Sequence, residues 1–370
     1  MKIKSIKLTN YRNIRDMELS FVPGVQVITG DNAQGKTNSL EAVFLTSTMR
    51  AFRTNRESML IRYGEKNATI QTVFEKNGRD QILTIELSDK ESKKVWLDGR
   101  RLAKTRDAIG LFQSVLFTPD HLMMIKGAPG ERREFLDMTL CAQSPGYTED
   151  LLQYSKALKN RNRLLKCEDE AMLATLPVWD ELLAKYGSRI ALARQTYVEQ
   201  LNEYAGQEYA AISGGKEKLK ILYVSQFTKE KLNREEYYKA ILDAMEKNRQ
   251  VDRENLSTTA GVHKDDFLTL LAGKSAKFYA SQGQVRSCVL AIKMAEAALL
   301  EKNSGHKPVI LLDDILSELD PSRQEYILRH TPENQCIVTA CEPDKLREIC
   351  GDCIWIEGGR RKDVSSSGRE

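Results

Sequence analysis

The sequence predicts an α/β fold, in which a mixed sheet and an antiparallel β lobe are divided by a mainly helical insert. Two observations predict the sheet. Residues 23–30, PGVQVITG, run from an apolar strand into a Gly-rich turn, and a helix with apolar residues at helical spacing follows at 37–48. Nearly continuous apolar strands return near the C-terminus, as in a parallel sheet that is buried on both faces. These strands lie at 308–315, 336–342 and 353–357.

A change of pattern predicts the insert, because from about residue 130 the chain reads as long charged helices. The expected elements are helices at roughly 145–172 and 178–212 with a break at Pro177, a strand at 219–227 and a helix near 233–249. We therefore expect a head domain of residues 1–125 plus 256–370, with residues 126–255 inserted as a lid or arm domain.

Alternating polar and apolar residues predict the antiparallel lobe. The expected strands lie at 3–9, at 17–21 and in several short runs between 67 and 102, with a turn at Asp98-Gly99. After the insert, residues 266–280 are expected to form a hairpin that turns at Gly273. A helix over 284–302 then leads into the apolar strand at 308–315.

Composition narrows the class of protein. The 370 residues are 41% hydrophobic and 29% charged, and no apolar run reaches the roughly 20 residues that cross a bilayer. The N-terminus alternates like a strand and lacks the apolar stretch of a secretory signal, so we expect a cytoplasmic protein. Seven cysteines without framework spacing fit reduced thiols. Cys350 and Cys353 form a CxxC, but a second ligand pair is lacking in the sequence, so zinc is not expected.

The charge permits a nucleic-acid partner without requiring one. Lys+Arg number 56 and Asp+Glu 52, which gives a net charge of +4. Local clusters of Lys and Arg are more informative, although solvated helix faces have the same appearance in sequence. The clusters lie at 50–56, 99–106, 130–134 and 156–166.

The segment GDNAQGKT matches the pattern G-x-x-x-x-G-K-[ST] of a phosphate-binding loop (P-loop). It follows a strand and opens a helix, which makes a chance match to a Gly-rich turn the weaker interpretation. Backbone N–H groups of such a loop point at phosphate oxygens beside the positive end of the helix. We expect Lys36 to reach the β- and γ-phosphates of ATP and Thr37 to ligate magnesium. The predicted nucleotide-binding residues are Gly30, Asp31, Asn32, Ala33, Gln34, Gly35, Lys36 and Thr37.

Two carboxylates end the apolar strand VILLDDI. The strand delivers Asp313 to its carboxyl end, where open α/β sheets place ligands, so Asp313 is the expected second magnesium residue. Asp314 follows and is expected to orient or deprotonate an attacking water, as the catalytic residue. The alternative for Asp314 is a solvated carboxylate at a strand end.

The stretch ASQGQ opens the helix at 284–302 and raises the question of what a run of small and amide side chains does there. The order P-loop, long insert, ASQGQ, apolar strand with Asp-Asp and SELD resembles that of ABC-type ATPase heads, whose signature motif covers the nucleotide of a second subunit. A guanine-reading motif, which a GTPase would carry, does not follow the P-loop. An N-cap role for Ser281 explains that serine as well, and both roles are compatible. The expected signature residues are Ser281, Gln282, Gly283 and Gln284.

Further segments resemble the RecF family of bacterial recombination and replication-repair proteins. The resemblance extends over residues 3–357 and rests on NYRNI, NAQGKTN, PDHLMMIKGAPGERREFLD, GVHKDDF, ASQGQ and DDILSELD. It implies an SMC-like ABC-type ATPase head with an inserted arm, which binds ATP and Mg²⁺, dimerises around two ATP molecules and grips double-stranded and gapped DNA. It also implies action with RecR and RecO in loading RecA, a contribution to the SOS response, and slow ATP hydrolysis that releases the DNA.

The resemblance adds site residues and exposes departures. It implies that Arg12 and Asn13 lie near the nucleotide, that the signature acts in trans, and that Asp320 lies at the dimer seam. Asp314 stands where other ABC heads carry a glutamate. Ala340 and Cys341 stand where those heads often present a histidine. His263 in GVHKDDF is either a substitute sensor of the γ-phosphate or a structural residue.

Three alternatives share some of these motifs. A transporter ATPase subunit normally has a far shorter separation between P-loop and signature. A structural SMC protein needs hundreds of heptad residues, where this insert has roughly 130 mixed ones. The third alternative is a DNA-binding module that uses ATP only for folding.

Overall fold

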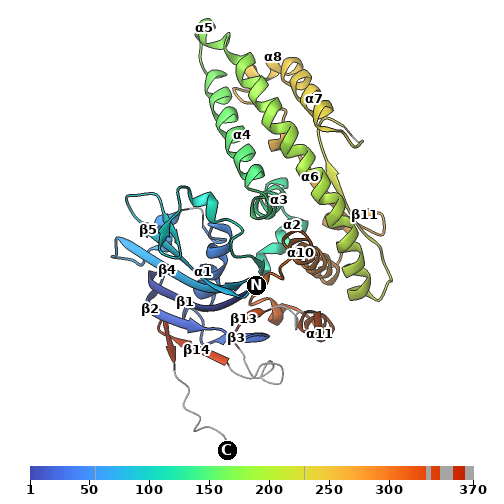
Figure 1. Ribbon diagram of the computed structural model, residues 1–370. Coiled ribbons are helices and arrows are strands. Elements are labelled where there is room, and N and C mark those ends of the chain that lie inside the picture. The colour runs from blue at the N-terminus through green and yellow to red at the C-terminus, as the bar shows by residue number, and fades with distance from the viewer. Residues whose placement is uncertain (55, 229, 331–334, 342–352, 363–370) are drawn as a thin grey trace, which may run out of the picture. The chain divides into compact units, whose positions relative to one another are not determined.

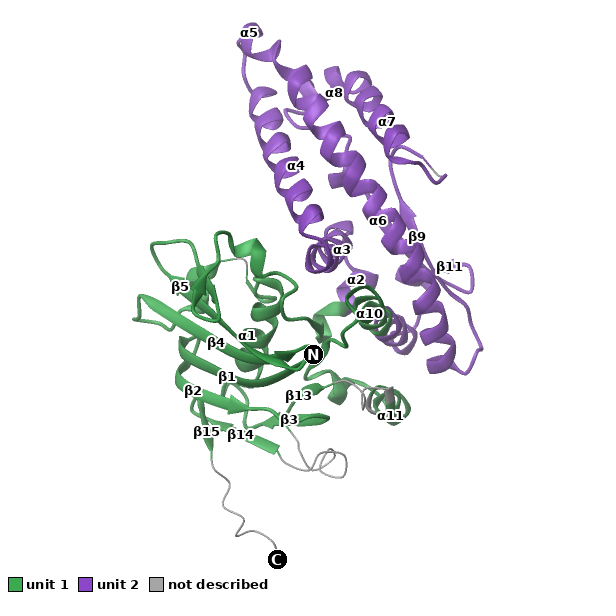
Figure 2. Ribbon diagram, viewed as in Figure 1, with its two compact units in different colours: residues 1–121, 293–370 green, residues 122–292 purple. Residues whose placement is uncertain are grey.

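The computed structural model describes residues 1–54, 56–228, 230–330, 335–341 and 353–362. The chain divides into two compact units, shown in Figure 2. Unit 1 comprises residues 1–121 and 293–370, and unit 2 comprises residues 122–292. Residues 256–292, which the sequence groups with the head domain, make their contacts within unit 2, because the strand at 266–271 pairs with the strand at 219–224.

Unit 1 contains the predicted parallel sheet, with strand order β15-β14-β3-β13-β12-β8. All neighbours are parallel except β15, which pairs antiparallel with β14 and makes the sheet mixed. The central strands are almost completely buried, as their continuous apolar sequences predict. The strands are β3 (Val25–Thr29), β8 (Ser114–Phe117), β12 (Val309–Asp313), β13 (Cys336–Ala340), β14 (Cys353–Glu357) and β15 (Arg360–Lys362).

The antiparallel lobe of unit 1 is a second six-stranded sheet of order β2-β1-β4-β5-β6-β7. Its strands alternate buried and exposed residues, and Asp98 and Gly99 turn between β6 and β7 with positive φ angles of 50° and 77°. The strands are β1 (Lys2–Tyr11), β2 (Ile14–Ser20), β4 (Asn67–Lys76), β5 (Arg79–Ser88), β6 (Lys94–Leu97) and β7 (Arg100–Arg101).

One buried helix joins the two sheets of unit 1. Helix α1 (Lys36–Thr48) contacts β12 and β13 of the parallel sheet and β1 and β4 of the antiparallel sheet, and most of its residues are buried (Figure 1). Because α1 begins directly after the P-loop, both sheets fix the position of the loop. The remaining helices are α11 (Pro321–His330) and the 3-10 turns η1 (Glu57–Leu60), η2 (Thr105–Ala108), η3 (Pro119–Leu122) and η5 (Ile315–Glu318).

Unit 2 is mainly helical, as the charged helical pattern of the inserted segment predicts. Its longest helix, α6, has 38 residues and packs along α4 and α7, and its three-stranded sheet has the order β11-β10-β9. The helices are α2 (Met123–Lys126), α3 (Pro129–Gln143), α4 (Pro145–Leu164), α5 (Glu170–Leu173), α6 (Leu176–Ser213), α7 (Arg234–Lys247), α8 (Arg249–Glu254), η4 (Val262–Lys264) and α9 (Ala276–Tyr279). The strands are β9 (Leu219–Val224), β10 (Asp266–Leu271) and β11 (Lys274–Ser275). Helix α10 (Gln282–Ser304) begins in unit 2 and ends in unit 1.

Buried ion pairs tie the helices of unit 2 together. The guanidinium of Arg161, fully buried on α4, donates from Nε to Asp180 on α6 at 2.6 Å and from Nη1 to Asp252 on α8 at 2.6 Å. Removing either carboxylate would leave the buried charge of Arg161 with only one of its two carboxylate partners, which is costly. This network explains why one arginine of the basic cluster at 156–166 points inward.

Some sequence expectations were wrong in detail. Residues 276–279 form helix α9 rather than the return strand of a hairpin, since β11 ends after two residues. The helix expected to reach residue 172 ends at Leu164, and α5 follows separately. Strand β8 and helix α11 were not predicted. Within the described residues, no helix is both long enough and apolar enough to cross a bilayer.

Candidate nucleotide-binding site

The P-loop connects the carboxyl end of β3 to α1, at the centre of the parallel sheet. Gly30 has a φ of 148°, and a Cβ atom there would lie 2.2 Å from the main-chain oxygen of Ile356 on β14. Only glycine fits that close approach. Gly35 has a φ of 116° and precedes the first residue of α1, so the loop turns sharply where the helix begins.

Lys36 lies inside the loop that precedes it. Its side chain is buried, and Nζ donates to the main-chain oxygens of Gly30 at 2.7 Å and Asp31 at 2.9 Å. The Sγ atom of Cys341 lies 3.3 Å from the same Nζ and donates to Oδ1 of Asn32 at 3.1 Å. Cys341 is thus at the position where the sequence lacks a histidine, and it contacts the P-loop directly.

Asp313 joins the ends of two neighbouring strands to the start of α1. Its Oδ1 accepts from the hydroxyl of Thr37 at 2.9 Å and from the hydroxyl of Thr339, at the end of β13, at 2.8 Å. Burial raises the pKa of Asp313, against the lowering effect of these two hydrogen bonds. A hydroxyl and a carboxylate at one point form the hard oxygen set that Mg²⁺ prefers, so these residues fit the predicted metal.

Asp314 lies one residue further, with a left-handed backbone (φ 51°, ψ 9°) that asparagine and aspartate adopt more readily than most residues. Its N–H donates to the hydroxyl of Thr339 at 3.0 Å, so both aspartates are fixed by one threonine. Its carboxylate is half-buried and lines the cavity beside the P-loop. Burial raises the pKa of Asp314, and the charge of Lys36 acts in the opposite direction.

A turn from the C-terminal end of the described chain braces the P-loop. The N–H of Gly358 donates to Oε1 of Gln34 at 2.5 Å, and the N–H of Gly359 donates to the main-chain oxygen of Gln34 at 3.1 Å. A Cβ atom on Gly359 would lie 2.9 Å from the main-chain oxygen of Asn13, and its φ is 71°. The turn therefore fits closely between the P-loop and the segment that follows β1.

Two cavities of unit 1 adjoin at the P-loop. The first, of about 470 Å³, is lined by P-loop residues from Asn32 to Thr37 and by Asp314. The second, of about 610 Å³, is lined by residues 58–59 and 61–65 with Arg12 and Asp89. The two cavities share three lining residues, so they lie next to each other. The shared residues are Asn13, Asn38 and Arg53.

Arg12 and Asn13, which the family resemblance added, lie at this space in different ways. Asn13 Nδ2 donates to the main-chain oxygen of Ala33 at 3.0 Å, and its Oδ1 accepts from Asn38 at 2.8 Å, so Asn13 holds the P-loop from outside. The guanidinium of Arg12 makes two hydrogen bonds of 2.9 Å to the buried carboxylate of Glu41. A direct role for Arg12 at the nucleotide remains a prediction.

The predicted signature residues belong to unit 2. Ser281 and Gln284 form a capping box: the N–H of Gln284 donates to Ser281 Oγ at 3.2 Å, and the N–H of Ser281 donates to Gln284 Oε1 at 2.8 Å. Ser281 and Gln282 are exposed, and Gly283 is partly exposed. The N-cap role expected for Ser281 is thus present, while its action in trans remains a prediction.

Asp320 and His263 occupy separate surroundings. Asp320 is exposed and caps α11, accepting from the hydroxyl of Ser322 at 2.8 Å and from the N–H of Arg323 at 3.1 Å. His263 lies in unit 2, and both ring nitrogens contact other groups there: Nδ1 lies 2.8 Å from the hydroxyl of Tyr154, and Nε2 lies 3.1 Å from the main-chain oxygen of Thr258. These contacts are structural, which favours the structural interpretation of His263.

The basic clusters differ in their exposure. In the cluster at 130–134, Arg132 is buried and makes a bidentate ion pair with Asp266 at 2.6 and 2.9 Å, and Arg133 donates to the main-chain oxygen of Asp265. Arg53, in the cluster at 50–56, lines the nucleotide cavity and donates to Asn38 at 3.2 Å. The density of Lys and Arg in the sequence therefore does not distinguish a buried structural arginine from one that lines the nucleotide cavity.

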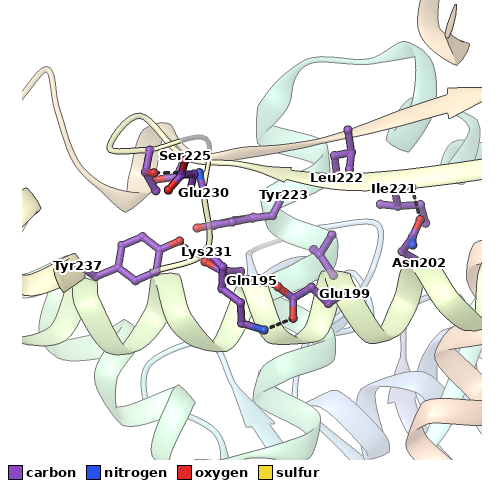
Figure 3. A pocket seen from close by; sticks show the side chains of 12 residues that line it. Gln195, Glu199, Asn202, Ile221, Leu222, Tyr223, Ser225, Glu230, Lys231 and Tyr237 are labelled. Carbon is purple, nitrogen blue, oxygen red and sulfur yellow. Dashed lines mark hydrogen bonds and ion pairs between the residues drawn. The ribbon is translucent and has the colours of Figure 1, made fainter. Parts of the chain in front are cut away.

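Unit 2 contains a further cavity of about 250 Å³ between α6, β9 and α7, shown in Figure 3. Its polar groups satisfy one another: Lys231 pairs with Glu199, and Tyr237 donates to Gln195. Gln195 also donates to Glu199 at 3.4 Å. The residues predicted from the motifs do not line this cavity.

Comparison with known proteins identifies a family that matches almost the whole chain. Residues 2–355 match the family described as the RecF/RecN/SMC N terminal domain. The chain is 38% identical, over 348 residues, to the DNA replication and repair protein RecF of Agathobacter rectalis, and the match covers 94% of each chain.

Solved structures extend the likeness to the fold. A structure described as the recombination mediator protein RecF-ATP in the RecFOR pathway superposes with a TM-score of 0.91 at 33% identity and covers 98% of both chains. The Smc head domain of Pyrococcus furiosus superposes with a TM-score of 0.56 at 17% identity, covering 98% of this chain and 95% of the other. The second match shows only the fold, and together they confirm the predicted fold class of an ABC-type head with an inserted helical part.

Proposed function

The chain belongs to the RecF family of DNA replication and repair proteins, and we propose that it is an ATP-dependent DNA-binding protein of recombinational repair and replication. In this proposal, ATP joins two copies of the chain in the cytoplasm, the dimer binds double-stranded and gapped DNA, and slow hydrolysis releases it. The single observation that carries the proposal is the P-loop cavity with Lys36 inside it and the Thr37–Asp313 contact at its edge.

The shape of the site supports a nucleoside triphosphate rather than a smaller anion. Backbone N–H groups and Lys36 suit the phosphates in the first cavity, and the adjoining cavity of about 610 Å³ leaves room for a nucleoside. The similar solved structure described as RecF-ATP supports ATP as the ligand. Asn13, Asn38 and Arg53 border both cavities, so they would contact a ligand that extends from one cavity to the other.

Magnesium would be held by Thr37 and Asp313, which fit it by chemistry and placement. When bound, it would neutralise charge on the phosphate oxygens. Asp314, half-buried at the same cavity, would accept a proton from water or orient that water for attack on the γ-phosphate. The raised pKa of Asp314 makes it a stronger base than an exposed aspartate.

The signature residues Ser281 to Gln284 would complete the site from a second copy. Exposed Ser281 and Gln282 at the first turn of α10 present a hydroxyl and N–H groups to an anion without adding a formal charge. Asp320 would lie at the seam between the copies. In the assembled site, Lys36 and magnesium would meet the charge of the phosphates.

Sedimentation velocity tests the dimer. Wild type should be a monomer alone and a dimer with ATP and Mg²⁺, and Ser281→Arg should stay monomeric because a bulky cation fills the place of the small hydroxyl. Nucleotide binding by each sample, measured in parallel, reports whether the P-loop is intact. A wild-type chain whose sedimentation does not respond to ATP and Mg²⁺ would remove the dimer from the proposal.

The outward face of α4 supports DNA as the partner. Four exposed cations are spaced three or four residues apart. Three of them lie on α4 opposite its buried face, and the fourth follows the end of the helix. Within the described residues they make no ion pairs, whereas exposed lysines of α7 are paired with carboxylates. Like charges at this spacing destabilise a helix, and DNA phosphates would relieve that cost. The four are Lys156, Lys159, Arg163 and Lys166.

A charge reversal tests this face. The double variant Lys156→Glu/Lys159→Glu should bind duplex DNA at least about tenfold more weakly and with a salt dependence reduced by about two phosphate contacts. The matched variant Lys239→Glu/Lys247→Glu reverses the same charge on α7 and should bind nearly as wild type. Equal losses in the two variants would show that overall charge, and not α4, governs binding.

RecR, RecO and RecA are the proposed protein partners. Their support is the family and the description of the similar structure as a recombination mediator in the RecFOR pathway. Analytical gel filtration of the chain with RecR, with and without ATP and gapped DNA, tests the first of these contacts. Failure of the two proteins to co-elute under all four conditions would exclude a stable complex.

A further inference from the structure

The signature segment is held by a residue that lies far from it in sequence. Glu217 stands 67 positions before Gln284, in the turn between α6 and β9, and its Oε1 accepts from Nε2 of Gln284 at 2.7 Å. Its other oxygen, Oε2, accepts from the hydroxyl of Tyr209 at 3.0 Å. Tyr209 is buried in the last turns of α6. One carboxylate therefore connects the end of the longest helix of unit 2 to the first turn of α10.

The contact fixes which way the amide of Gln284 points. A carboxylate only accepts hydrogen bonds, so Glu217 must face the NH₂ group of Gln284 and leave the amide oxygen for the N–H of Ser281. That N–H bond, 2.8 Å long, closes the capping box around Ser281. Without Glu217, only the N–H of Ser281 would hold the amide in this orientation, and rotation by half a turn would set two donors against each other and open the box.

The charge of Glu217 also acts on a second residue of α10. Burial, and after it the negative charge of Glu217, raise the pKa of Cys288, one turn after Gln284, to about 12. The charge thus lies along the first two turns of α10. The preceding Gly214 and Gly215 have positive φ angles of 66° and 74°, and they turn the chain sharply from α6 toward Glu217.

We infer that Glu217 is a positioning residue for the signature, which orients Ser281 through Gln284 and couples the end of α6 to the ATP-dependent contact between two copies. The inference rests on the proposed function, in which Ser281 meets the nucleotide of the second copy. The inference assigns a role to the arm, because a displacement of the last turns of α6 would move Ser281 through the side chains of Glu217 and Gln284. DNA or a protein partner bound to the arm would thereby influence the dimer.

Dimerisation with ATP and Mg²⁺, measured by sedimentation velocity over a concentration series, tests the inference. Glu217→Ala should raise the dimer dissociation constant about tenfold, because each dimer loses this hydrogen bond twice. Glu217→Gln keeps an amide oxygen that accepts from Gln284 and should stay within about threefold of wild type. The matched control is Glu181→Ala, which removes an exposed carboxylate from the other end of α6 and should leave dimerisation unchanged.

A double-mutant cycle separates positioning from general stability. If Glu217 acts through Ser281, the variant Ser281→Ala/Glu217→Ala should dimerise no more weakly than Ser281→Ala alone. Additive losses, or a Glu217→Ala chain that dimerises as wild type does, would overturn the inference. Thermal unfolding checks that each variant folds, and Gln284→Met removes the other partner of the same bond should Glu217→Ala not fold. A wild type that fails to dimerise would instead refute the proposed function and this inference together.

Discussion

Replacing His263 by glutamine tests whether this histidine is a structural residue of unit 2 or a sensor of the nucleotide. Nε2 faces the main-chain oxygen of Thr258, which only accepts, so Nε2 carries the proton and Nδ1 accepts from the hydroxyl of Tyr154. The neutral ring satisfies both contacts. Burial lowers the pKa of His263 to about 4, although the hydrogen bond to Thr258 acts in the opposite direction. Protonation at Nδ1 would also remove its acceptor.

The sign of the pH effect follows from this lowered pKa. Between pH 6.5 and about 4 the unfolded chain binds one proton more than the folded chain at His263. The stability from the neutral ring is therefore fully present above pH 6.5 and is lost as the pH falls. The whole difference is about 3 kcal/mol, of which about 2 kcal/mol is lost between pH 7 and pH 5. Asp265, whose pKa burial raises to about 6, contributes in the opposite direction, since its stability is lost as the pH rises.

The comparison of wild type with His263→Gln isolates the histidine, because Asp265 titrates in both proteins. The free energy of unfolding of both proteins can be measured by urea denaturation from pH 7.5 to pH 5. Over this range the difference between wild type and the variant should shift by about 2 kcal/mol to the disadvantage of wild type. ATP binding by the variant at pH 7.5 should match wild type. A constant difference in stability across that range, or a variant that folds but no longer binds ATP, would refute the structural role.

Three other variants test the nucleotide-binding site around the P-loop. Lys36→Ala should weaken ATP binding at least about 100-fold, because it removes the buried ammonium of the phosphate cavity. Isothermal titration calorimetry measures the affinity, and a near-normal value would show that ATP does not bind at the P-loop. Asp314→Asn should keep ATP binding, slow hydrolysis at least about 100-fold and trap a DNA-bound dimer, whereas prompt release of DNA would count against Asp314 as the catalytic carboxylate. Gly359→Ala places a Cβ atom 2.9 Å from the main-chain oxygen of Asn13 at a φ of 71°, so it should weaken ATP binding severalfold, and unchanged affinity would show that the turn does not brace the loop.

The local chemistry of the head could be read from the sequence because it lies in continuous segments. The P-loop, the apolar strand before Asp313 and the buried neighbouring strands each carry their pattern within a few residues, and the sheet order brings them together. Strand β8 has four residues, too few for a period to show, although all of them are buried. The return strand expected after Gly273 is a helical turn because β11 pairs over only two residues.

Contacts between distant segments could not be predicted in the same way. Nothing near Arg12 in the sequence indicates that its guanidinium would form an ion pair with the buried carboxylate of Glu41. The same holds for Gln34, which meets Gly358 more than 300 residues later, and for the contact of Glu217 with Gln284. Such residues have no motif, because their role depends on which segments the fold places side by side.

Duplex DNA binding by wild type and Ser281→Arg, each with and without ATP and Mg²⁺, shows whether the ATP-bound dimer is the form that binds DNA. In this proposal, Ser281 on one copy recognises ATP held by Lys36 on another, and the resulting dimer is the form that grips DNA. The account predicts tight binding only by wild type with ATP and Mg²⁺, with affinity falling steeply as salt rises. Equal binding by the variant in the presence of ATP and Mg²⁺ would contradict it.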